Sequence, residues 1–464
     1  MVAGLVVLAN RLPIEQHEDG TWSSSPGGLA SALSSVTQPG TQWIGWGGPA
    51  SVAGPSFEHD DLTLQPVPLT ATEIEGYYHG FANSVLWPLF HGRIRQVEIN
   101  RTWWRQYRAV NARFARAAAR AAPRNAVVWV HDYHLLLVPS LLREVRPDLR
   151  IGLFLHIPFP NVQLFSVLPW RRQLVDGMLG ADVIGFQVPD DVTNFVATAE
   201  RLAGVEVLDG NTIMDGNHEI EAAAFPISID AAHWSALGRS AAGRAQELRA
   251  ELGVDSVILG VDRLDYTKGI TQRLQAYGEL LDEGRVDAAS CTFVQVAVPS
   301  RADVPAYQEE REAVDDLVAA INERHGSPGH LPVRLEHRSL DETELAAWYR
   351  AADVMMVTSL ADGMNLVAKE FVAATTDLDG VLVLSEFAGA SQELERALIV
   401  NPYDIDAVKT ALAKALEMPR IERAARQRDM RAVVAREDVH RWARAFLQHL
   451  ATPTRVPHEL VVGI

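Results

Sequence analysis

The chain has 464 residues, more than the roughly 250–300 at which a single hydrophobic core stops growing, so we expect two domains. Hydrophobic residues make up 48% and charged residues 22%, a composition that excludes a disordered chain. The net charge of −17 would repel nucleic acid and anionic membrane surfaces, and no apolar stretch approaches the roughly 18 residues that span a bilayer. We therefore expect neither nucleic acid nor a membrane as a partner.

The N-terminal segment and the cysteine content favour a cytoplasmic protein. The opening MVAGLVVLANRLP has no basic segment and no small-residue cleavage site, so it predicts a first strand and not a secretion signal. The single cysteine, Cys291, has no partner for an intramolecular disulfide and lies in the apolar run CTFVQVAV. This usage suits a reducing compartment, and we expect a buried, inert thiol.

Short apolar runs recur along the chain with helical segments between them. Most runs are continuous and do not alternate with polar residues, which is typical of parallel strands covered on both faces. Helical patterns such as Leu135–Arg146 and Asp341–Ala352 separate them, so the sequence predicts an α/β fold. The expected strands are Leu5–Ala9, Val127–Val130, Ile151–Leu155, Val183–Phe186, Val257–Val261, Phe293–Val298, Val354–Val357, Val381–Leu384 and Leu398–Val400.

The division into domains is predicted between Phe225–Asp230 and the strand at Val257, because the stretch between them is polar and helical in pattern. We expect an N-terminal domain over 1–235, a C-terminal domain over 236–438, and a helix and tail over 439–464 that pack back on the first domain. Thr37–Pro68 and Ala203–Asn217, rich in turn-forming residues, are interpreted as surface excursions or hairpins.

The first polar constellation follows the first strand. Arg11 comes directly after it, and Gly28 lies in SPGGL at the start of an expected helix. Adjacent glycines let a backbone approach a ligand closely, and free N–H groups at a helix start favour phosphate. An ordinary turn would explain the glycines alone, but Arg11 nearby favours an anion site.

Basic residues also follow two later strands. Arg263 and Lys268 in VDRLDYTKG lie five positions apart after the strand at Val257, and Arg301 in VPSRAD follows the strand at Phe293. Two cations at the carboxyl end of a strand suit a diphosphate leaving group without a metal. Surface pairing of Arg with Asp is the structural alternative, but Arg11, Arg263, Lys268 and Arg301 would supply the positive charge that an acidic chain needs for anionic substrates.

The segment TSLADGMNLVAKE is another strand–turn–helix pattern. Gly363 would permit the turn, and the N–H groups of Asn365 and Leu366 would face a phosphate. Glu370, about one helical turn further, is placed to accept the two hydroxyls of a ribose. The alternative is that Asp362 or Asn365 only caps the helix and Glu370 pairs with a surface lysine.

Histidines and a carboxylate follow two neighbouring strands. HDYH contains His131, Asp132 and His134, and FLHIPFP contains His156. Zinc is the obvious alternative, but a third and a fourth ligand are missing at persuasive spacing, so we expect these groups to contact sugar hydroxyls and expect no metal. The prolines after His156 would fix the placement of its ring.

Three aromatic residues in turn-rich segments are candidates for stacking on a sugar. Trp46 lies in WIGWGG, and Tyr78 and Trp87 lie in YYHGFANSVLWPLF, which we interpret as loops. Core packing is the commonest fate of such rings, so the sequence leaves both roles open.

Taken together, these segments resemble the trehalose-6-phosphate synthase family of retaining glycosyltransferases from about residue 5 to 450. The motifs that carry the likeness, in chain order, are ANRLP, SPGGLASAL, WIGWGG, YYHGFANSVLWPLFH, WVHDYHLLLVPSLLR, FLHIPFP, GVDRLDYTKG, PSRADVPAYQ and DGMNLVAKEFVAA. The resemblance implies a GT-B fold, two Rossmann-like domains facing across a cleft, with the acceptor bound by the first and the nucleotide sugar by the second. It also implies transfer of glucose from UDP-glucose or GDP-glucose to glucose 6-phosphate, with no cofactor and no required metal.

The resemblance also implies a role for each candidate residue. The implied catalytic residues are His156, which binds the transferred glucose, Arg263 and Lys268, which stabilise the departing diphosphate, and Asp362. The implied donor-binding residues are Gly28, Arg263, Lys268, Asp362, Gly363, Met364, Asn365, Leu366 and, on the ribose, Glu370. The implied acceptor-binding residues are Arg11 and Arg301 on the phosphate, Trp46, Tyr78 and Trp87 beside them, and Asp132 on the sugar.

Several questions stay open at this point. There are two alternatives: a pseudo-glycosyltransferase that couples cyclitols on the same fold, and a catalytically silent subunit that senses sugar phosphates. The presence of Arg263, Lys268, Asp362 and Glu370 argues against the silent subunit. Arg338 in the EHRSL segment is a candidate to pair with guanine, so the donor base stays open, as do homo-oligomerisation, allosteric control and the role of the product.

Overall fold

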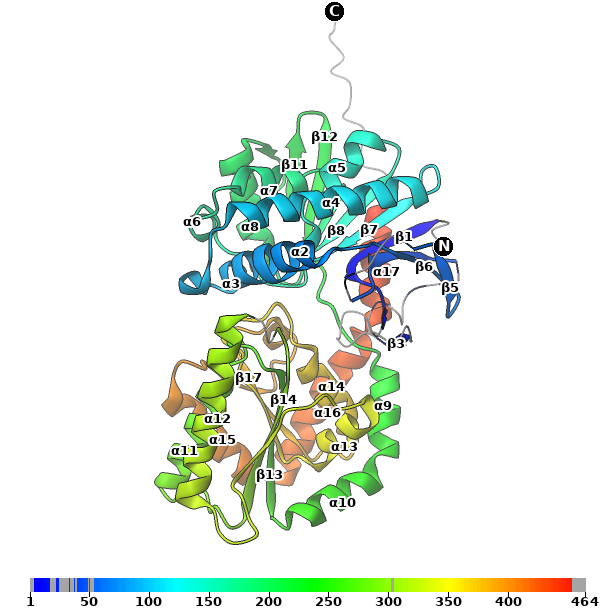
Figure 1. The fold of residues 1–464 in the computed structure, drawn as a ribbon. Helices are drawn as coiled ribbons and strands as arrows, with labels where there is room; N and C mark the ends of the chain where they lie inside the picture. Colours follow the sequence, from blue (N-terminus) through cyan, green and yellow to red (C-terminus); the bar gives the residue numbers. More distant parts are fainter. Residues whose placement is uncertain are drawn as a thin grey trace, which may run out of the picture. The chain divides into compact units, whose positions relative to one another are not determined.

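The computed structural model describes residues 4–16, 22–24, 33, 37, 40–48, 50, 54–301 and 304–452. Two compact units divide the chain. The first comprises Met1–Phe90, Val97–Phe225 and Ala443–Ile464, and the second comprises His91–Gln96 and Pro226–Trp442. Each unit has its own sheet with helices packed on it (Figure 1), which confirms the predicted α/β class.

The first unit is built on a ten-stranded sheet in the order β10-β11-β12-β9-β8-β7-β1-β4-β6-β5. Neighbouring strands run parallel from β12 to β6, and antiparallel pairs close both edges. The strands are β1 (Leu5–Arg11), β4 (Gln42–Trp46), β5 (Phe57–His59), β6 (Leu62–Pro66), β7 (Val127–His131), β8 (Arg150–Phe154), β9 (Val183–Phe186), β10 (Glu206–Val207), β11 (Thr212–Asp215) and β12 (His218–Ala224), with a separate hairpin of β2 (Ile14–Gln16) and β3 (Trp22–Ser24).

Helices cover both faces of this sheet, as continuous apolar strands require. Figure 1 shows α4 in front of the sheet and α17 behind it. Phe446 of α17 stacks on Trp129 of β7 at a centroid distance of 5.0 Å, and a Cβ on Gly152 would lie only 2.7 Å from the Phe446 ring. The helices of the unit are α2 (Ala71–Glu73), η1 (Ile74–Leu86), α3 (Trp87–Phe90), α4 (Arg101–Ala121), η3 (Tyr133–Leu135), α5 (Val138–Val145), α6 (Val162–Phe165), α7 (Arg171–Met178), α8 (Pro189–Ala203) and α17 (Val439–Ala451).

Two sequence-based expectations for this unit need correction. Thr37–Pro68 contains an expected hairpin, β5 with β6, but it is not a surface excursion, because β4 and β6 also pair in parallel within the main sheet. The segment YYHGFANSVLWPLF is helical and not a loop: it lies in the π-helix η1 and in α3. Glycine and aromatic residues are weak helix formers, but buried packing, such as that of Phe81 on Tyr107 at 4.6 Å, overrides local propensity.

The second unit contains a six-stranded parallel sheet in the order β15-β14-β13-β16-β17-β18. Its strands are β13 (Ser256–Arg263), β14 (Cys291–Val298), β15 (Val333–Glu336), β16 (Val354–Val357), β17 (Val381–Ser385) and β18 (Leu398–Val400). Its helices are η2 (Ile94–Gln96), α9 (Ala231–Ser240), α10 (Ala242–Leu252), α11 (Ile270–Asp282), α12 (Pro305–His325), α13 (Glu342–Ala351), α14 (Leu366–Ala374), η4 (Gly389–Gln392), α15 (Ile405–Glu417) and α16 (Arg420–Arg436).

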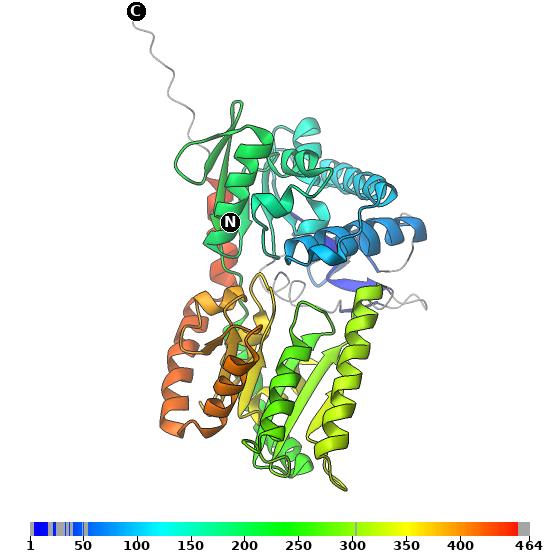
Figure 2. The ribbon, with the colours of Figure 1, turned by 90° about the vertical axis from the view of Figure 1, so that its left-hand side faces the viewer.

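One hydrophobic core joins α11, α12 and α15 to a face of this sheet, and Figure 2 shows the yellow-green α12 along it. Cys291 at the start of β14 belongs to this core; burial raises the pKa of its thiol to about 12, so the expectation of a buried, inert cysteine is confirmed. No helix in the described part of the chain combines the length and the apolar composition needed to cross a membrane.

The predicted boundary at 235/236 falls inside α9, whereas the contacts divide the chain between Phe225 and Pro226. The polar helices α9 and α10 are part of the second unit because their apolar sides pack there. The ring of Trp234 lies 5.7 Å from that of Tyr349 on α13, and a Cβ on Gly238 would meet the carbonyl oxygen of Ala374. The expected helical pattern of this stretch is therefore present as α9 and α10, and the boundary lies before them.

Both sheets contain a point at which the strand order reverses. In the first unit β1 lies between β7 and β4, and in the second β13 lies between β14 and β16. In open parallel sheets, the carboxyl ends of the strands that flank such a switch point form the usual ligand site. The fold therefore directs attention to the residues that follow β1, β7, β13 and β16.

Candidate active site

Arg11, at the carboxyl end of β1, lies against two aromatic rings of the first unit. Its guanidinium carbon is 4.0 Å from the Trp46 ring centroid and 5.5 Å from that of Tyr78. Cation–π contacts of this kind stabilise a guanidinium by about 1 kcal/mol and fix its plane. The structure thus brings three sequence-predicted residues together. Gly28 lies outside the described residues.

The helices η1 and α3 carry Tyr78 and Trp87 to the segment after β7. Tyr78 stacks on His134 with a centroid distance of 6.0 Å and an interplanar angle of 15°. Trp87, at the start of α3, lies 5.7 Å from the Tyr133 ring. A long π-helix is rare and frequently marks a functional site, because it directs side chains differently from an α-helix.

Asp132, directly after β7, has a strained backbone. Its φ is 73°, a left-handed value that L-residues seldom adopt. Its N–H donates to the carbonyl oxygen of Phe154 at 2.7 Å, and its Oδ1 accepts from the N–H of His156 at 3.2 Å. The surrounding contacts therefore hold Asp132 in an unfavourable conformation, which is a typical feature of binding sites.

His131 and His156 form a buried pair at the ends of β7 and β8. Nδ1 of His131 and Nε2 of His156 are 3.1 Å apart, so one imidazole donates to the other. Burial lowers the pKa of His156 to about 3, and burial together with His156 lowers the pKa of His131 well below its ordinary value. Both rings are neutral near pH 7, so His156 is suited to hydrogen bonding and not to charge stabilisation.

In the second unit, Lys268 and Asp362 form an ion pair next to the switch point. The Lys268 ammonium lies 2.6 Å from Oδ2 of Asp362, with only 11% and 13% of the two side chains exposed. Burial raises the pKa of Asp362, but Lys268 outweighs this and holds it below its ordinary value. The sequence placed both residues in the donor site, and the structure brings them into direct contact.

The turn that follows β16 depends on Asn365. The tight turn expected at Gly363 has its left-handed residue at Asn365, whose φ is 76°. Its side chain caps α14 by accepting from the N–H of Ala368 at 3.3 Å and donates to Asp362 at 3.1 Å. Asn365 therefore caps α14, as the structural alternative predicted. The first N–H groups of α14, from Leu366 onward, have no backbone acceptor within the helix.

Glu370 is held by a buried tyrosine, Tyr349, that lies outside the sequence motifs. The Tyr349 hydroxyl donates to Oε2 of Glu370 at 2.8 Å, and Tyr349 itself is fully buried. Burial raises the pKa of Glu370 to about 7, although the Tyr349 hydrogen bond opposes the shift. The expected alternative, a surface lysine partner for Glu370, is not what the structure has.

Arg263 and Arg301 share a carboxylate, Asp265, that was not among the sequence-predicted site residues. Arg263 ends β13, Arg301 follows β14, and each guanidinium lies 3.7 Å from Oδ2 of the fully buried Asp265. The signal was present as a second acidic residue in DRLDY, but sequence alone does not give the parallel pairing of β13 with β14 that brings Arg301 to it.

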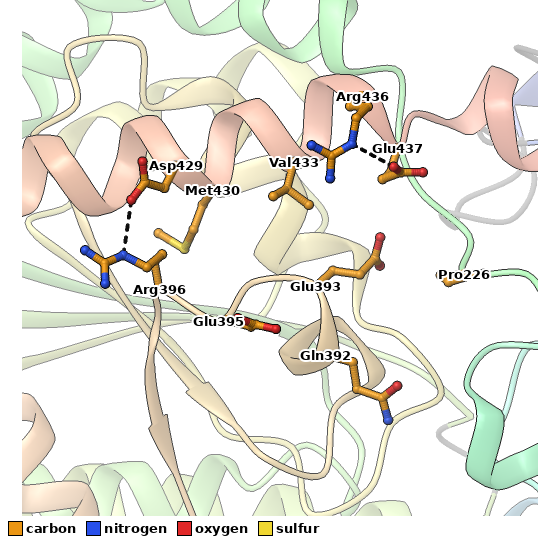
Figure 3. A pocket seen from close by; sticks show the side chains of 10 residues that line it. All are labelled: Pro226, Gln392, Glu393, Glu395, Arg396, Asp429, Met430, Val433, Arg436 and Glu437. Atoms are coloured by element: carbon orange, nitrogen blue, oxygen red, sulfur yellow. Dashed lines mark hydrogen bonds and ion pairs between the residues drawn. The ribbon is translucent and has the colours of Figure 1, made fainter.

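A separate cavity of about 450 Å³ opens in the second unit between η4 and α16 (Figure 3). It contains none of the sequence-predicted residues, and its charges largely compensate one another, as in the Arg396–Asp429 pair at 3.2 Å and the Arg436–Glu437 pair at 2.9 Å. Among the described residues, no group of three or more His, Cys, Asp or Glu side chains is arranged to hold a metal. Metal independence stays a prediction.

Comparisons with known proteins agree with this arrangement. The family described as Glycosyltransferase family 20 matches residues 4–452. The trehalose-6-phosphate synthase of Mycolicibacterium gilvum is 47% identical over 479 residues, covering 98% of this chain and 95% of the relative. That of Mycolicibacterium paratuberculosis is 48% identical over 470 residues, covering 96% and 95%.

Solved structures extend the likeness to the fold. An alpha,alpha-trehalose-phosphate synthase (UDP-forming) from Burkholderia xenovorans, in complex with glucose-6-phosphate, has a TM-score of 0.90 and 36% identity and covers 97% of this chain and 99% of that chain. An E. coli structure bound with UDP-2-fluoro glucose has a TM-score of 0.88 and 34% identity, with coverage of 97% and 99%. The GT-B fold expected from the motifs is confirmed, and the chain belongs to glycosyltransferase family 20.

Proposed function

We propose that this glycosyltransferase is an α,α-trehalose-6-phosphate synthase that transfers glucose, with retention, from UDP-glucose to glucose 6-phosphate. The observation that carries the proposal is the set of cations at the carboxyl ends of β13 and β14. Arg263, Lys268 and Arg301 lie there beside buried carboxylates, in a chain whose net charge is −17. Such a concentration of positive charge suits phosphorylated substrates.

Two kinds of observation favour UDP-glucose over GDP-glucose: the ligands of similar solved structures and the contacts of Arg338 in this chain. The Burkholderia xenovorans neighbour is UDP-forming, and the E. coli neighbour is bound with a UDP sugar. In this chain the Nε of Arg338 donates to Glu336 at 2.9 Å, so a guanine base would compete with a carboxylate for that edge of the guanidinium.

In this proposal the second unit holds the donor. Lys268 and Arg263 stabilise the charge that develops on the diphosphate, Asp362 and the Gly363, Met364, Asn365 and Leu366 backbone bind the transferred glucose, and Glu370 accepts from the ribose. The Lys268–Asp362 pair must then open or be shared when the diphosphate binds, because the ammonium already donates to the carboxylate at 2.6 Å.

The first unit supplies acceptor contacts in this proposal. Arg11, with Trp46 and Tyr78 against it, contacts the acceptor phosphate, and Trp87 and Asp132 contact the acceptor sugar. His156 binds the transferred glucose as a neutral imidazole. Arg301, which belongs to the second unit, is proposed as a second guanidinium for the phosphate, since a guanidinium fork suits a phosphate monoester.

The chemical step that fits these roles is attack on the same face from which the diphosphate leaves. The anomeric hydroxyl oxygen of glucose 6-phosphate forms a bond to C1 of glucose as the C1–O bond to the diphosphate breaks. The hydroxyl proton passes to an oxygen of the departing diphosphate, whose negative charge Arg263 and Lys268 share. A covalent carboxylate intermediate, as in retaining glycosidases, has no part in this scheme.

The test is an assay with UDP-glucose and GDP-glucose side by side, with glucose 6-phosphate or glucose as acceptor. We expect α,α-trehalose 6-phosphate, identified by the anomeric coupling constants in its NMR spectrum, and faster turnover with UDP-glucose. Glucose should be a very poor acceptor. Product with a β linkage, or none with either donor, would refute the proposal. A cyclitol-coupling enzyme or a silent sensing subunit, the alternatives that the comparisons do not favour, would fail this assay.

A further inference from the structure

Asp265 is a buried carboxylate between two cations that are proposed to bind different substrates. It is fully buried at the turn after β13. Its Oδ2 lies 3.7 Å from Nη2 of Arg263 and 3.7 Å from Nη1 of Arg301. No role in binding or catalysis follows for Asp265 from the motifs, yet it is the one described carboxylate that pairs with both guanidiniums.

The two oxygens of Asp265 make different contacts. Oδ1 accepts from the N–H of Thr267 at 3.0 Å and from its hydroxyl at 2.9 Å, which stabilises the local turn. Oδ2 faces the cations and also accepts from the Tyr307 hydroxyl at 3.2 Å. A substitution that keeps the first oxygen and removes the charge therefore separates a structural role from an electrostatic one.

The cations differ in how firmly they are held. Arg301 has a left-handed φ of 48°, exposes only 5% of its side chain and donates to the Tyr307 hydroxyl. Arg263 exposes 41% of its side chain. Two guanidiniums close to one oxygen repel each other, and a negative charge between them offsets this repulsion. Asp265 carries that charge at neutral pH, because burial raises its pKa but Arg263, Arg301 and Lys268 bring it below the ordinary value.

We propose that Asp265 is a positioning residue that holds the donor-side Arg263 and the acceptor-side Arg301 in a fixed relation to each other. The proposal rests on the proposed function, because the two arginines are assigned to different substrates there. A preorganised pair of cations acts mainly on the transition state, in which charge moves to the leaving diphosphate. The negative charge of Asp265 does not itself attract anionic substrates.

This role predicts an unusual division between kcat and KM. In Asp265→Asn the side chain keeps its size and its Oδ1 still accepts from Thr267, but the charge is lost. We expect kcat to fall about thirtyfold or more, with KM for both substrates unchanged or lowered, because the site gains net positive charge while its arginines lose their fixed placement. A purely structural role would raise KM and lower the melting temperature without this division.

Matched variants make the experiment decisive. Asp282→Asn is the control, since Asp282 on α11 also contacts two basic side chains, the guanidinium of Arg324 at 2.6 Å and the imidazole of His325 at 2.8 Å, and it should leave kcat unchanged. Tyr307→Phe removes one hydrogen bond to Asp265 and the contact with Arg301 while keeping every charge. We expect its kcat to fall about threefold to tenfold.

The outcomes separate the two proposals. A wild-type chain that forms no trehalose 6-phosphate from either donor would refute the proposed function. An active wild type with an unchanged kcat in Asp265→Asn, or with a fall in kcat matched by a rise in KM, would overturn the positioning role alone. If Asp265→Asn does not fold, Tyr307→Phe decides: a wild-type kcat there would overturn the role as well.

Discussion

The two units of this chain organise their candidate residues in different ways. In the first, the guanidinium of Arg11 lies on two aromatic rings, and the residues after β7 and β8 include the strained Asp132 and a buried pair of neutral imidazoles. In the second, three cations each face a buried carboxylate. The first pattern suits recognition of a sugar by shape and hydrogen bonds, and the second suits control of charge during bond cleavage.

The comparison also shows how each unit limits the cost of its charges. Arg11 lies on aromatic rings, and its one carboxylate partner among the described residues, Glu15, is 3.9 Å away and partly exposed, so the pair neutralises the guanidinium only weakly. Lys268 is neutralised by Asp362 until a ligand replaces or shares that contact. The second cluster is therefore stable without a substrate, and we expect Lys268 to donate to a diphosphate once the contact with Asp362 is replaced or shared.

The largest predicted effect comes from removing a cation of the second unit. Lys268→Ala or Arg263→Ala should lower kcat on the order of a hundredfold or more, because the lost charge acts chiefly on the transition state. Lys409→Ala is the control. Lys409 is about as buried as Lys268 and also pairs with carboxylates, Glu279 at 2.9 Å and Glu283 at 2.7 Å, but it is not a candidate site residue. A change confined to KM in the first two variants would contradict the leaving-group role.

Removing Arg11 should have a smaller and different effect. In Arg11→Ala we expect KM for glucose 6-phosphate to rise about tenfold to a hundredfold, and the preference for it over glucose to shrink, because a charged hydrogen bond to the phosphate is lost. Arg172→Ala, which removes an exposed pair with Asp176, serves as the control on the same unit. Equal discrimination in wild type and Arg11→Ala would remove the basis for the assignment.

A pH dependence follows from Glu370. Its pKa of about 7 means that the free enzyme gains the carboxylate as pH rises through 7, so kcat/KM for the donor should rise about threefold to tenfold between pH 6 and 8. Glu370→Gln should flatten this rise. Tyr349→Phe removes the hydrogen bond that lowers the pKa and should move the midpoint upwards. An unchanged profile in Glu370→Gln would assign the titration to another group.

The smallest effect is expected from removing metals. Protein cations already face the position proposed for the diphosphate, so full activity should survive exhaustive treatment with EDTA. Loss of turnover that magnesium or manganese restores would mean that a metal supplies the charge assigned to Arg263 and Lys268.

Much of this fold is predictable from sequence because buried parallel strands are continuous apolar runs. Val183–Phe186, Val354–Val357 and Leu398–Val400 are strands with the predicted bounds. The strand β4 escaped detection because glycine, proline and serine around it indicated turns, and its pairing with β1 is a tertiary contact. The helix η1 escaped because its stability comes from buried aromatic packing.

For the candidate site, sequence gives chemical type but not partnership. Lys268 and Asp362 are 94 residues apart and meet only because β13 and β16 are neighbours. Asp265 likewise meets Arg301 because β13 and β14 are neighbours, and Tyr349 of α13 meets Glu370 of α14 through tertiary packing. Asp265 lies in a motif and Tyr349 does not, so a motif shows which residues are candidates but not which of them the topology brings into contact.

The most direct test of the account is calorimetric titration of UDP and of glucose 6-phosphate into wild type, Arg11→Ala and Lys268→Ala. If the first unit binds the acceptor and Lys268 binds the diphosphate, Arg11→Ala should lose about tenfold or more in affinity for glucose 6-phosphate and keep its affinity for UDP. Lys268→Ala should show the reverse. Parallel loss of both affinities in either variant, with the fold intact by circular dichroism, would contradict the assignment.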